Sequence, residues 1–280
     1  NEHADVYTQL MFNDYESIAQ IAPSGNFFET NTINCANPLL PTFVNTTDAD
    51  GNPVTLDLRE TIGCDAAAIA NNDSVTMYIG RRNVEGGGRQ QSFANNSFRA
   101  VAGVRGAIND GWGYDVSAQY SSVSANTATL NYFVTPRLAR ALNVIDNPAT
   151  PELDPTCQSV LDGTDTACVP WNPFVPGGIT ADQLNYLQAS GLQIGRISQE
   201  IYNGIVTGDL GVYGIKSPMA SDGIQVVFGT EYRRDELSNS VDALQEQGQL
   251  AGSGGATIGI SGSTKVTEMF MEARVPIAQD

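Results

Sequence analysis

The chain has 280 residues, a formal net charge of −17 and only 16% charged residues. A nucleic-acid-binding protein is expected to be basic or to carry a basic stripe, so this charge excludes nucleic acid as a partner. The sequence contains no apolar run of roughly twenty residues, which excludes a membrane-spanning helix. The low charged fraction, offset by glycine and small polar residues, favours β-strands and loops over helical bundles.

The acidic residues are unevenly placed along the chain. Residues 14–74 hold many carboxylates against a single base, Arg59, and residues 143–195 hold carboxylates but no lysine or arginine. The arginines gather instead in stretches that alternate like strands. The sequence therefore divides into acidic loops and mixed-charge strands.

The four cysteines lie in pairs inside these two acidic segments. Three connectivities are possible, and we favour the local pairing that closes each loop on itself. The favoured pairs are Cys35 with Cys64 and Cys157 with Cys168. Disulfides imply an oxidising location such as the periplasm or the cell surface. A zinc site is a poor interpretation, because no C-x-x-C spacing occurs and His3 is the only histidine, so we expect no metal site.

The first third of the chain predicts a strand, a long loop and a longer strand. Residues 5–13 alternate between apolar and polar side chains, which is typical of a half-buried strand. Residues 14–74 are predicted as a long loop, in which the turn-rich stretch 45–53 forms the tip of a small hairpin. Residues 75–108 are predicted as one long strand, interrupted by a bulge at the glycines near residue 86.

Residues 96–122 predict a hairpin around a turn at 109–111. Side chains alternate between the faces of a strand, so each arm has one apolar and one polar face. The apolar face carries the aromatic residues Phe98, Trp112, Tyr114 and Tyr120. Each arm is about as long as a tilted membrane-crossing strand, roughly ten residues. Aromatic residues near both ends suit the girdles of a membrane barrel. A hairpin in a soluble sandwich has the same alternation, so these residues leave both interpretations open.

The rest of the chain predicts two short helices and three more strands. A helix is expected over residues 137–144, and Thr180 is a suitable N-cap for a second helix over 181–189 that ends at Gly191. Strands are expected over 196–210, 224–232 and 268–275, with a glycine-rich loop over 237–262. Long and short connections alternate along this order. Outer-membrane barrels sort their loops in this way, whereas a soluble sandwich has no reason to do so.

Several stretches resemble a TonB-dependent outer-membrane receptor. They are RRNVEGGGR at 81–89, FRAVAGVRG at 98–106, GWGYDV at 111–116, QIAPSG at 20–25, CANPLL at 35–40, GTD at 163–165, CVPWN at 168–172, FGTEYRR at 228–234 and EMFMEARVP at 268–276. No single stretch is diagnostic, and the resemblance lies in their number and order across nearly the whole chain.

The resemblance implies a large barrel filled by a plug domain, which imports scarce solutes with energy from an inner-membrane complex. Such transporters have about 22 strands, and six are expected here. We therefore expect an all-β fold: an antiparallel transmembrane β-barrel segment in which residues 1–280 form part of one barrel domain, with long extracellular loops carrying short helices. The chain starts at Asn1 without a signal core, and the plug and C-terminal strands have no counterpart, so we expect a segment that does not transport alone.

The same resemblance implies the partners and the orientation of side chains. The expected partners are outer-membrane lipid, an imported small-molecule solute and, through the missing plug, the inner-membrane TonB complex. The localisation is then the bacterial outer membrane. The polar faces of the strands would face the lumen through Arg99, Arg105, Asp115, Gln119, Glu231, Arg233, Glu268, Glu272 and Arg274.

The candidate ligand-binding residues are Arg81, Arg82, Glu85 and Arg89. At the mouth of a barrel, these arginines could bind a carboxylate or phosphate of a solute through bidentate hydrogen bonds. The alternative is that they pair with neighbouring acids and hold the lumen together. The sequence does not decide between the two.

Enzymatic signals are thin, so no catalytic residue and no cofactor are expected. A single histidine provides no triad, and Glu268 with Glu272 is better explained as a charged strand face than as a glycosidase pair. Asp48 and Asp50 lack the twelfth-position glutamate of a calcium loop. No glycine-rich stretch is followed by the Lys-Ser/Thr of a phosphate loop. The remaining alternative is a secreted, soluble β-protein that binds glycans at the cell surface, which would place charges on the apolar strand faces.

Overall fold

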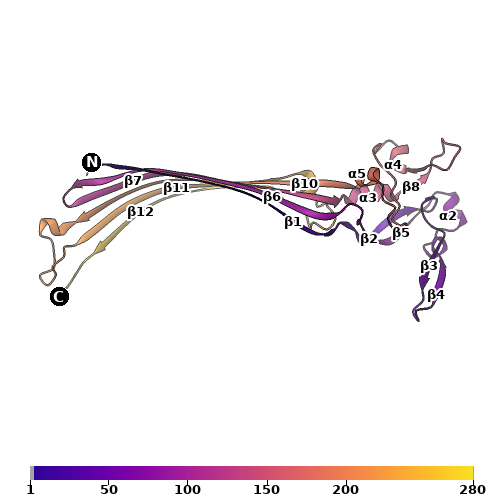
Figure 1. Ribbon diagram of the computed structural model, residues 1–280, viewed down its shortest axis with the longest axis horizontal. Coiled ribbons are helices and arrows are strands. Elements are labelled where there is room, and N and C mark those ends of the chain that lie inside the picture. Colours follow the sequence, from indigo (N-terminus) through magenta and orange to yellow (C-terminus); the bar gives the residue numbers. More distant parts are fainter. Residues whose placement is uncertain (1–2, 280) are drawn as a thin grey trace.

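A long, curved, single-layered sheet dominates the computed structural model, which describes residues 3–279; a cluster of loops and short helices lies at one end (Figure 1). The sheet has six strands in the order β1-β6-β7-β10-β11-β12, and every neighbouring pair is antiparallel. The strands are β1 (Asp5–Pro23), β6 (Gly88–Asn109), β7 (Trp112–Phe133), β10 (Gln188–Asp209), β11 (Gln225–Val241) and β12 (Ile260–Arg274). Within residues 3–279, β1 and β12 are edges, so the sheet does not close. Asn1, at which the sequence starts, lies outside the described residues.

Strands β1, β11 and β12 are about twice as long as the sequence predicts. β1 continues to Pro23, although residues 14–23 were expected in a loop, and β11 continues to Val241. The reason is backbone pairing: residues 14–21 of β1 form a regular antiparallel ladder with β6, even where their side chains do not alternate. Hydrogen-bonded pairing between strands overrides a weak local pattern, because strand propensity depends on context.

The single bulged strand predicted over residues 75–108 is wrong. The structure has two strands, β5 (Ser74–Arg82) and β6, and β5 pairs with β2 (Gly25–Asn34) in a separate two-stranded sheet. The interruption at residues 83–87 includes Gly87, whose φ of 76° is a conformation that glycine adopts at little cost. Ser24 alone separates β1 from β2.

Connections at the two ends of the sheet differ in length (Figure 1). At the end that holds both termini, β6 turns into β7 through Asp110 and Gly111, and β10 connects to β11 through the short helix η1 (Leu210–Tyr213). The connections at the other end build the loop cluster. The prediction counted residues 75–108 as one strand. With β5 counted instead as part of a connection, the shorter connections, residues 110–111 and 210–224, still lie at one end of the sheet.

The loop cluster contains short helices and small two-stranded sheets. Besides β2 and β5, its elements are β3 (Phe43–Thr47), β4 (Pro53–Asp57), α1 (Leu58–Thr61), α2 (Ala66–Ala70), α3 (Thr135–Leu142), β8 (Val144–Asp146), β9 (Pro155–Cys157), α4 (Gln158–Leu161), α5 (Ala181–Leu187) and α6 (Ala243–Glu246). The hairpin predicted at 45–53 is β3–β4, and it projects from the cluster (Figure 1). No helix in the described part of the chain is long and apolar enough to cross a membrane.

Both predicted helices are present in this cluster. Thr180 caps α5, and its side chain accepts a hydrogen bond from the backbone of Gln183, whose own side chain completes a capping box. α5 ends at Leu187 rather than near Gly191, because Gln188 begins β10 and pairs with Phe133. Pairing with a neighbouring strand thus ends the helix before the glycine does.

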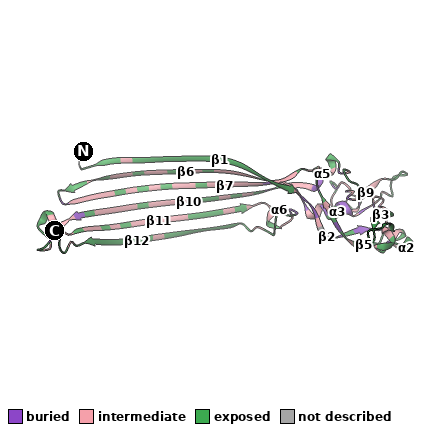
Figure 2. Ribbon diagram, turned by 60° about the horizontal axis from the view of Figure 1, so that its bottom comes forward, coloured by how far each residue is buried: buried purple, intermediate pink, exposed green. Residues whose placement is uncertain are grey.

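The buried core sits in the loop cluster and not on the sheet (Figure 2). Its largest members are fully buried side chains from five different segments: Ile33, Phe133, Leu138, Leu142, Trp171 and Leu187. Phe133 contacts Trp171 edge to face, with ring centroids 5.7 Å apart. The sheet, in contrast, is exposed on both faces over most of its length.

Candidate functional site

One face of the sheet carries all of the residues that the sequence predicts to face a lumen. Residues that pair directly across antiparallel strands lie on the same face. Asp115 pairs with Arg105, Gln119 shares its face and pairs with Ile201, and Ile201 pairs with Arg233. Glu231 pairs with Glu268, which places Glu268, Glu272 and Arg274 of β12 on the same side. We call this side the polar face; Arg105 lies on it, opposite to Phe98.

Side chains on the polar face form a chain of contacts across the strands. Arg99 donates to the side-chain oxygen of Gln119 (2.8 Å), and Gln119 donates to Gln199 (3.2 Å). Gln199 donates to Asp235 (2.8 Å), which pairs with Arg233 (3.4 Å). These bonds join β6, β7, β10 and β11 into one polar surface.

A second group of contacts on the polar face lies nearer the termini. The Tyr7 hydroxyl donates to Asp115 (2.7 Å), and Arg105 pairs with Asp5 (3.1 Å) while its guanidinium lies 5.6 Å from the Tyr7 ring centroid. The Tyr7 ring lies directly over Gly103, where a Cβ atom would come within 2.3 Å of it. Glycine at this position is therefore needed for the ring to lie flat on the sheet.

The opposite face holds a continuous apolar surface, which we call the apolar belt. It consists of the side chains on this face within residues 6–12, 98–106, 112–120, 202–208, 226–232 and 267–273. None of these side chains is charged, and many are strongly exposed; Leu10 is 77% and Met269 85% exposed. Soluble monomers rarely expose contiguous apolar patches larger than a few hundred Å².

The belt has a defined limit on the side of the loop cluster. Aromatic residues occupy this limit on five neighbouring strands: Phe12, Phe98, Tyr120, Tyr202 and Tyr232. The next residue on the same face is polar on β6 and β7 and charged on the other strands. The charged residues are Asp14, Glu200, Arg234 and Lys265. The face therefore changes from apolar to polar or charged within one side-chain step.

This limit runs obliquely across the strands. The backbone pairing links Phe12 on β1 to one residue on each following strand: Phe98, Ser122, Ser198 and finally Glu236 on β11. The limit on β11 is Tyr232, which lies 236 − 232 = 4 residues nearer the short turns. A shift of about 13 Å along the strands over about 19 Å across them gives a slope of about 35°.

The predicted ligand-binding residues lie where the sheet meets the loop cluster, and the structure brings them together in pairs. Arg81 forms an ion pair with Glu85. Arg82 and Arg89 lie 5.1 and 5.6 Å from the centroid of the Phe27 ring. Arg82 donates to the carbonyl of Pro23, and Arg89 donates to the carbonyls of Ala22 and Gly252. These internal contacts fix the bend between β1–β6 and β2–β5.

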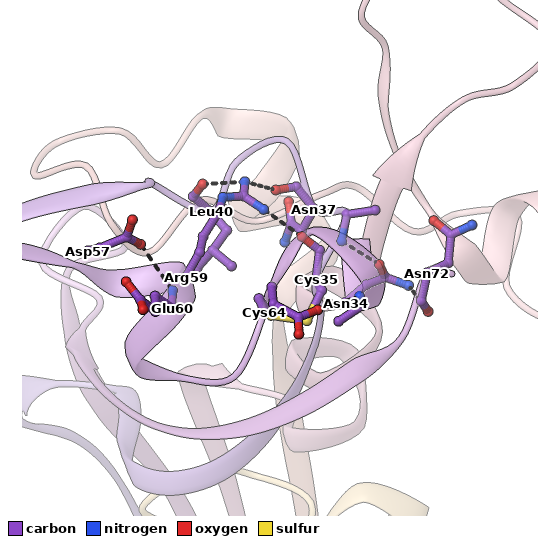
Figure 3. Close-up of a disulfide and its surroundings, with 12 residues drawn as sticks. Asn34, Cys35, Asn37, Leu40, Asp57, Arg59, Glu60, Cys64 and Asn72 are labelled. Atoms are coloured by element: carbon purple, nitrogen blue, oxygen red, sulfur yellow. Dashed lines mark hydrogen bonds between the residues drawn. A yellow bond between two sulfur atoms is a disulfide. The ribbon is translucent and has the colours of Figure 1, made fainter. Parts of the chain in front are cut away.

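Both disulfides have the favoured local pairing, and both lie in the loop cluster. Cys35 is bonded to Cys64, and Cys157 is bonded to Cys168. Arg59, the one base of residues 14–74, lies beside the first disulfide and donates to the carbonyls of Cys35 (2.5 Å), Asn37 (2.9 Å) and Leu40 (2.7 Å) (Figure 3). A planar guanidinium has five donors in a fixed fork, so one side chain orders the whole turn.

A polar pocket that the sequence does not reveal lies between α3, α5 and the loop closed by Cys157–Cys168. Its volume is about 610 Å³, and its polar lining consists of Arg137, Arg140, Asp165, Asp182, Asn185 and Tyr186. The residues are up to 49 positions apart (186 − 137), so only the packing of α3 against α5 joins them. The sequence indicates this pocket only through two pairs of polar residues at helical spacing, Arg137 with Arg140 and Asp182 with Asn185.

Tyr186 lines this pocket with its hydroxyl group on Asp165. Burial, together with the hydrogen bond that its hydroxyl donates to Asp165 (2.8 Å), raises the pKa of Tyr186 to about 12. A neutral phenol can donate this bond, whereas a phenolate would repel the carboxylate. The pocket wall is therefore held by a protonated tyrosine at physiological pH.

Comparisons with protein-family models, curated proteins and solved structures found no match to this chain. Within residues 3–279, no group of three or more histidine, cysteine, aspartate or glutamate side chains is placed to hold a metal ion. The geometry of the two sheet faces and of the loop cluster therefore carries the functional argument.

Proposed function

We propose that this chain is part of an outer-membrane TonB-dependent receptor that binds and imports a scarce solute. In this proposal the six-stranded sheet is a section of the barrel wall, and the loop cluster is part of the extracellular vestibule. The solute class that the family offers is broad: a siderophore, vitamin, glycan or metal complex. One observation carries the proposal, namely the uncharged apolar belt with its oblique aromatic limit.

The slope of the belt supports a membrane barrel rather than a soluble sheet. Strands of closed barrels tilt by about 35–45° from the barrel axis, so a membrane surface crosses their hydrogen-bonding register at that angle. The slope of the belt limit that follows from the register and ideal strand spacings, about 35°, lies at the lower end of this range. A soluble sheet packed against a second layer has no reason to change from apolar to polar or charged along such a line.

The height of the belt supports the same conclusion. On β7 the belt extends from Trp112 to Tyr120, a separation of 120 − 112 = 8 residues. At about 3.4 Å per residue and a tilt of about 35°, this corresponds to about 22 Å along the membrane normal. Outer-membrane barrels have apolar bands of about 25 Å, flanked by aromatic girdles at both interfaces. Trp112 and Tyr114 would then lie at the periplasmic interface.

The remaining parts of the sheet fit the same role. The polar face would line the lumen and face the plug, through which the inner-membrane TonB complex acts. The edges β1 and β12 expose unpaired backbone groups, which a lipid environment does not tolerate. We therefore propose that further strands of the same protein pair with these edges. The runner-up, a soluble glycan-binding protein, is disfavoured by the lack of charge on the belt.

Fractionation of the full-length protein that contains this chain tests the membrane assignment. We expect it in the outer-membrane fraction, extractable only with detergent. A protein that is monomeric and soluble without detergent would contradict the proposal. Import is tested separately, by measuring uptake of candidate solutes in a strain that lacks the gene; restored uptake on complementation supports a transporter, and unchanged uptake of every class contradicts it.

A further inference from the structure

The polar pocket between α3 and α5 contains two charges that no neighbouring side chain compensates. Its other charges are balanced internally. Asp165 pairs with Arg140 (3.1 Å), accepts the Tyr186 hydroxyl (2.8 Å) and accepts the backbone N–H of Ala167 (3.2 Å). Asp165 therefore has its acceptors occupied, and its charge is matched by Arg140.

Arg137 supplies the uncompensated positive charge. It extends from α3 and donates through one terminal nitrogen, Nη1, to the carbonyls of Tyr186 (2.9 Å) and Gln188 (3.2 Å). Its guanidinium lies 5.8 Å from the centroid of the Tyr186 ring. Among the described residues, no carboxylate lies within ion-pair distance of it. The Nε–Nη2 edge of this guanidinium is thus free for a bidentate bond with a ligand carboxylate.

Asp182 supplies a negative charge without a side-chain partner from the first turn of α5, where the helix N-terminus favours a carboxylate. Within residues 3–279 its carboxylate has no ion pair and no side-chain hydrogen bond, and the residue is exposed at the pocket. Asn185 lies one turn further along the same helix and lines the same pocket. One wall of the pocket therefore offers a free cation, and the other offers a free anion with an amide beside it.

We infer that this pocket binds a zwitterionic solute, such as a short peptide, with its carboxylate on Arg137 and its ammonium group on Asp182. Charge complementarity supports this class: an anionic solute would leave Asp182 unpaired, and a neutral sugar would leave both charges unpaired. A volume of about 610 Å³ is suitable for a dipeptide or tripeptide. The inference rests on the proposed function, because it places the pocket in the extracellular vestibule.

The test is a binding cycle on the detergent-solubilised full-length protein, with trialanine and N-acetyl-trialanine as probes. Acetylation removes the ammonium charge of the peptide, and Asp182→Asn removes its proposed partner. We expect the wild type to bind trialanine at least about tenfold more tightly than the acetylated peptide. We expect Asp182→Asn to weaken the binding of trialanine by the same factor and to leave the binding of the acetylated peptide unchanged. The reason is that acetylation and the substitution each remove the same interaction.

Glu152→Gln is the matched control, since Glu152 is an exposed acid of the same region outside the pocket. It should bind both peptides as the wild type does, and thermal unfolding should show that Asp182→Asn stays folded. Additive effects of acetylation and Asp182→Asn would overturn the inference. So would a preference for glucuronate or a neutral sugar over trialanine, or no peptide binding at all. An outer-membrane protein that fails only this test would leave the proposed function intact.

Discussion

The sheet and the loop cluster of this chain are stabilised in different ways. The sheet is a single layer held by backbone ladders, and its apolar side chains, such as Leu10 and Met269, are exposed. The loop cluster has a buried core around Trp171 and two disulfides. The comparison teaches that the cluster buries its apolar side chains within itself, whereas the sheet leaves its apolar face uncovered, which the proposed function assigns to lipid. Destabilising substitutions in the two regions should therefore be detected by different assays.

The largest effect is expected in the core of the loop cluster. Trp171 is fully buried against Phe133, and its backbone N–H donates to the carbonyl of Ala141 (2.9 Å). Trp171→Ala should lower the stability of the cluster by about 3–5 kcal/mol, through lost burial and the cavity left behind. Hydrogen exchange should become faster in the cluster and stay unchanged in the sheet. Leu153→Ala, at a position that is 70% exposed, is the control. Equal loss of protection in both regions would contradict the separation.

A charge in the middle of the apolar belt should act on the sheet alone. Val116 lies on the belt, halfway between Trp112 and Tyr120, and the next residue, Ser117, points to the polar face. Val116→Arg should cost about 2–4 kcal/mol of folding free energy in lipid vesicles, because an arginine at the bilayer midplane is poorly solvated. Ser117→Arg should cost much less. If Ser117→Arg lost more folding free energy than Val116→Arg, the polar face and not the belt would be the one that faces lipid.

Substitutions of Arg59 test whether this one side chain orders the loop that the Cys35–Cys64 disulfide closes. Arg59→Ala removes one donor from each of three backbone carbonyls, of which, among the described residues, only that of Asn37 keeps another, the Leu40 N–H, and it should lower the local stability by about 2 kcal/mol. Arg59→Lys should restore only part of it, since an ammonium group lacks the planar fork. Limited proteolysis between Cys35 and Cys64, with the disulfide intact, measures the effect. Unchanged cleavage in Arg59→Ala would show that the disulfide suffices.

The smallest expected effect is a pH dependence that belongs to the cluster. The folded-state pKa of Tyr186 is raised to about 12, above its ordinary value of 10. Its contribution to stability is therefore complete below pH 10 and is lost as the pH rises towards 12. Tyr186→Phe should cost about 1 kcal/mol at neutral pH and should flatten the alkaline part of the profile. Chemical unfolding at several pH values, with phenolate absorbance, measures both. An equally steep profile in Tyr186→Phe would assign the dependence to another group.

The belt-facing halves of the strands can be predicted from the sequence, because their side chains alternate. Phe98 and Arg99, or Glu231 and Tyr232, differ in polarity at each step, so the face of each residue follows directly. The favoured disulfides follow from the acidic segments that hold each cysteine pair. The loop-facing halves cannot be predicted in this way, because polar and apolar side chains do not alternate regularly there. Residues 14–23, which include Tyr15, Ile18 and Ile21, therefore resemble a loop until they pair with β6.

The slope of the belt and the polar pocket also could not be predicted. The slope is a property of register, and it appears only when Phe12 and Tyr232 are connected through four strand pairings. The pocket joins Arg137 to Asp182 across 45 residues (182 − 137), and α3 and α5 carry no local sign that they meet. In both cases the information lies in long-range packing and not in any window of the sequence.

Quenching of tryptophan fluorescence by brominated lipids tests the central claim most directly. The chain has two tryptophans, Trp112 on the belt and Trp171 in the core of the loop cluster. In the full-length protein reconstituted into vesicles, comparison with Trp112→Phe and Trp171→Phe variants isolates each signal. We expect lipids brominated near the headgroup to quench Trp112 and to leave Trp171 unchanged. Equal emission of Trp112 in brominated and ordinary lipid would contradict a lipid-facing belt.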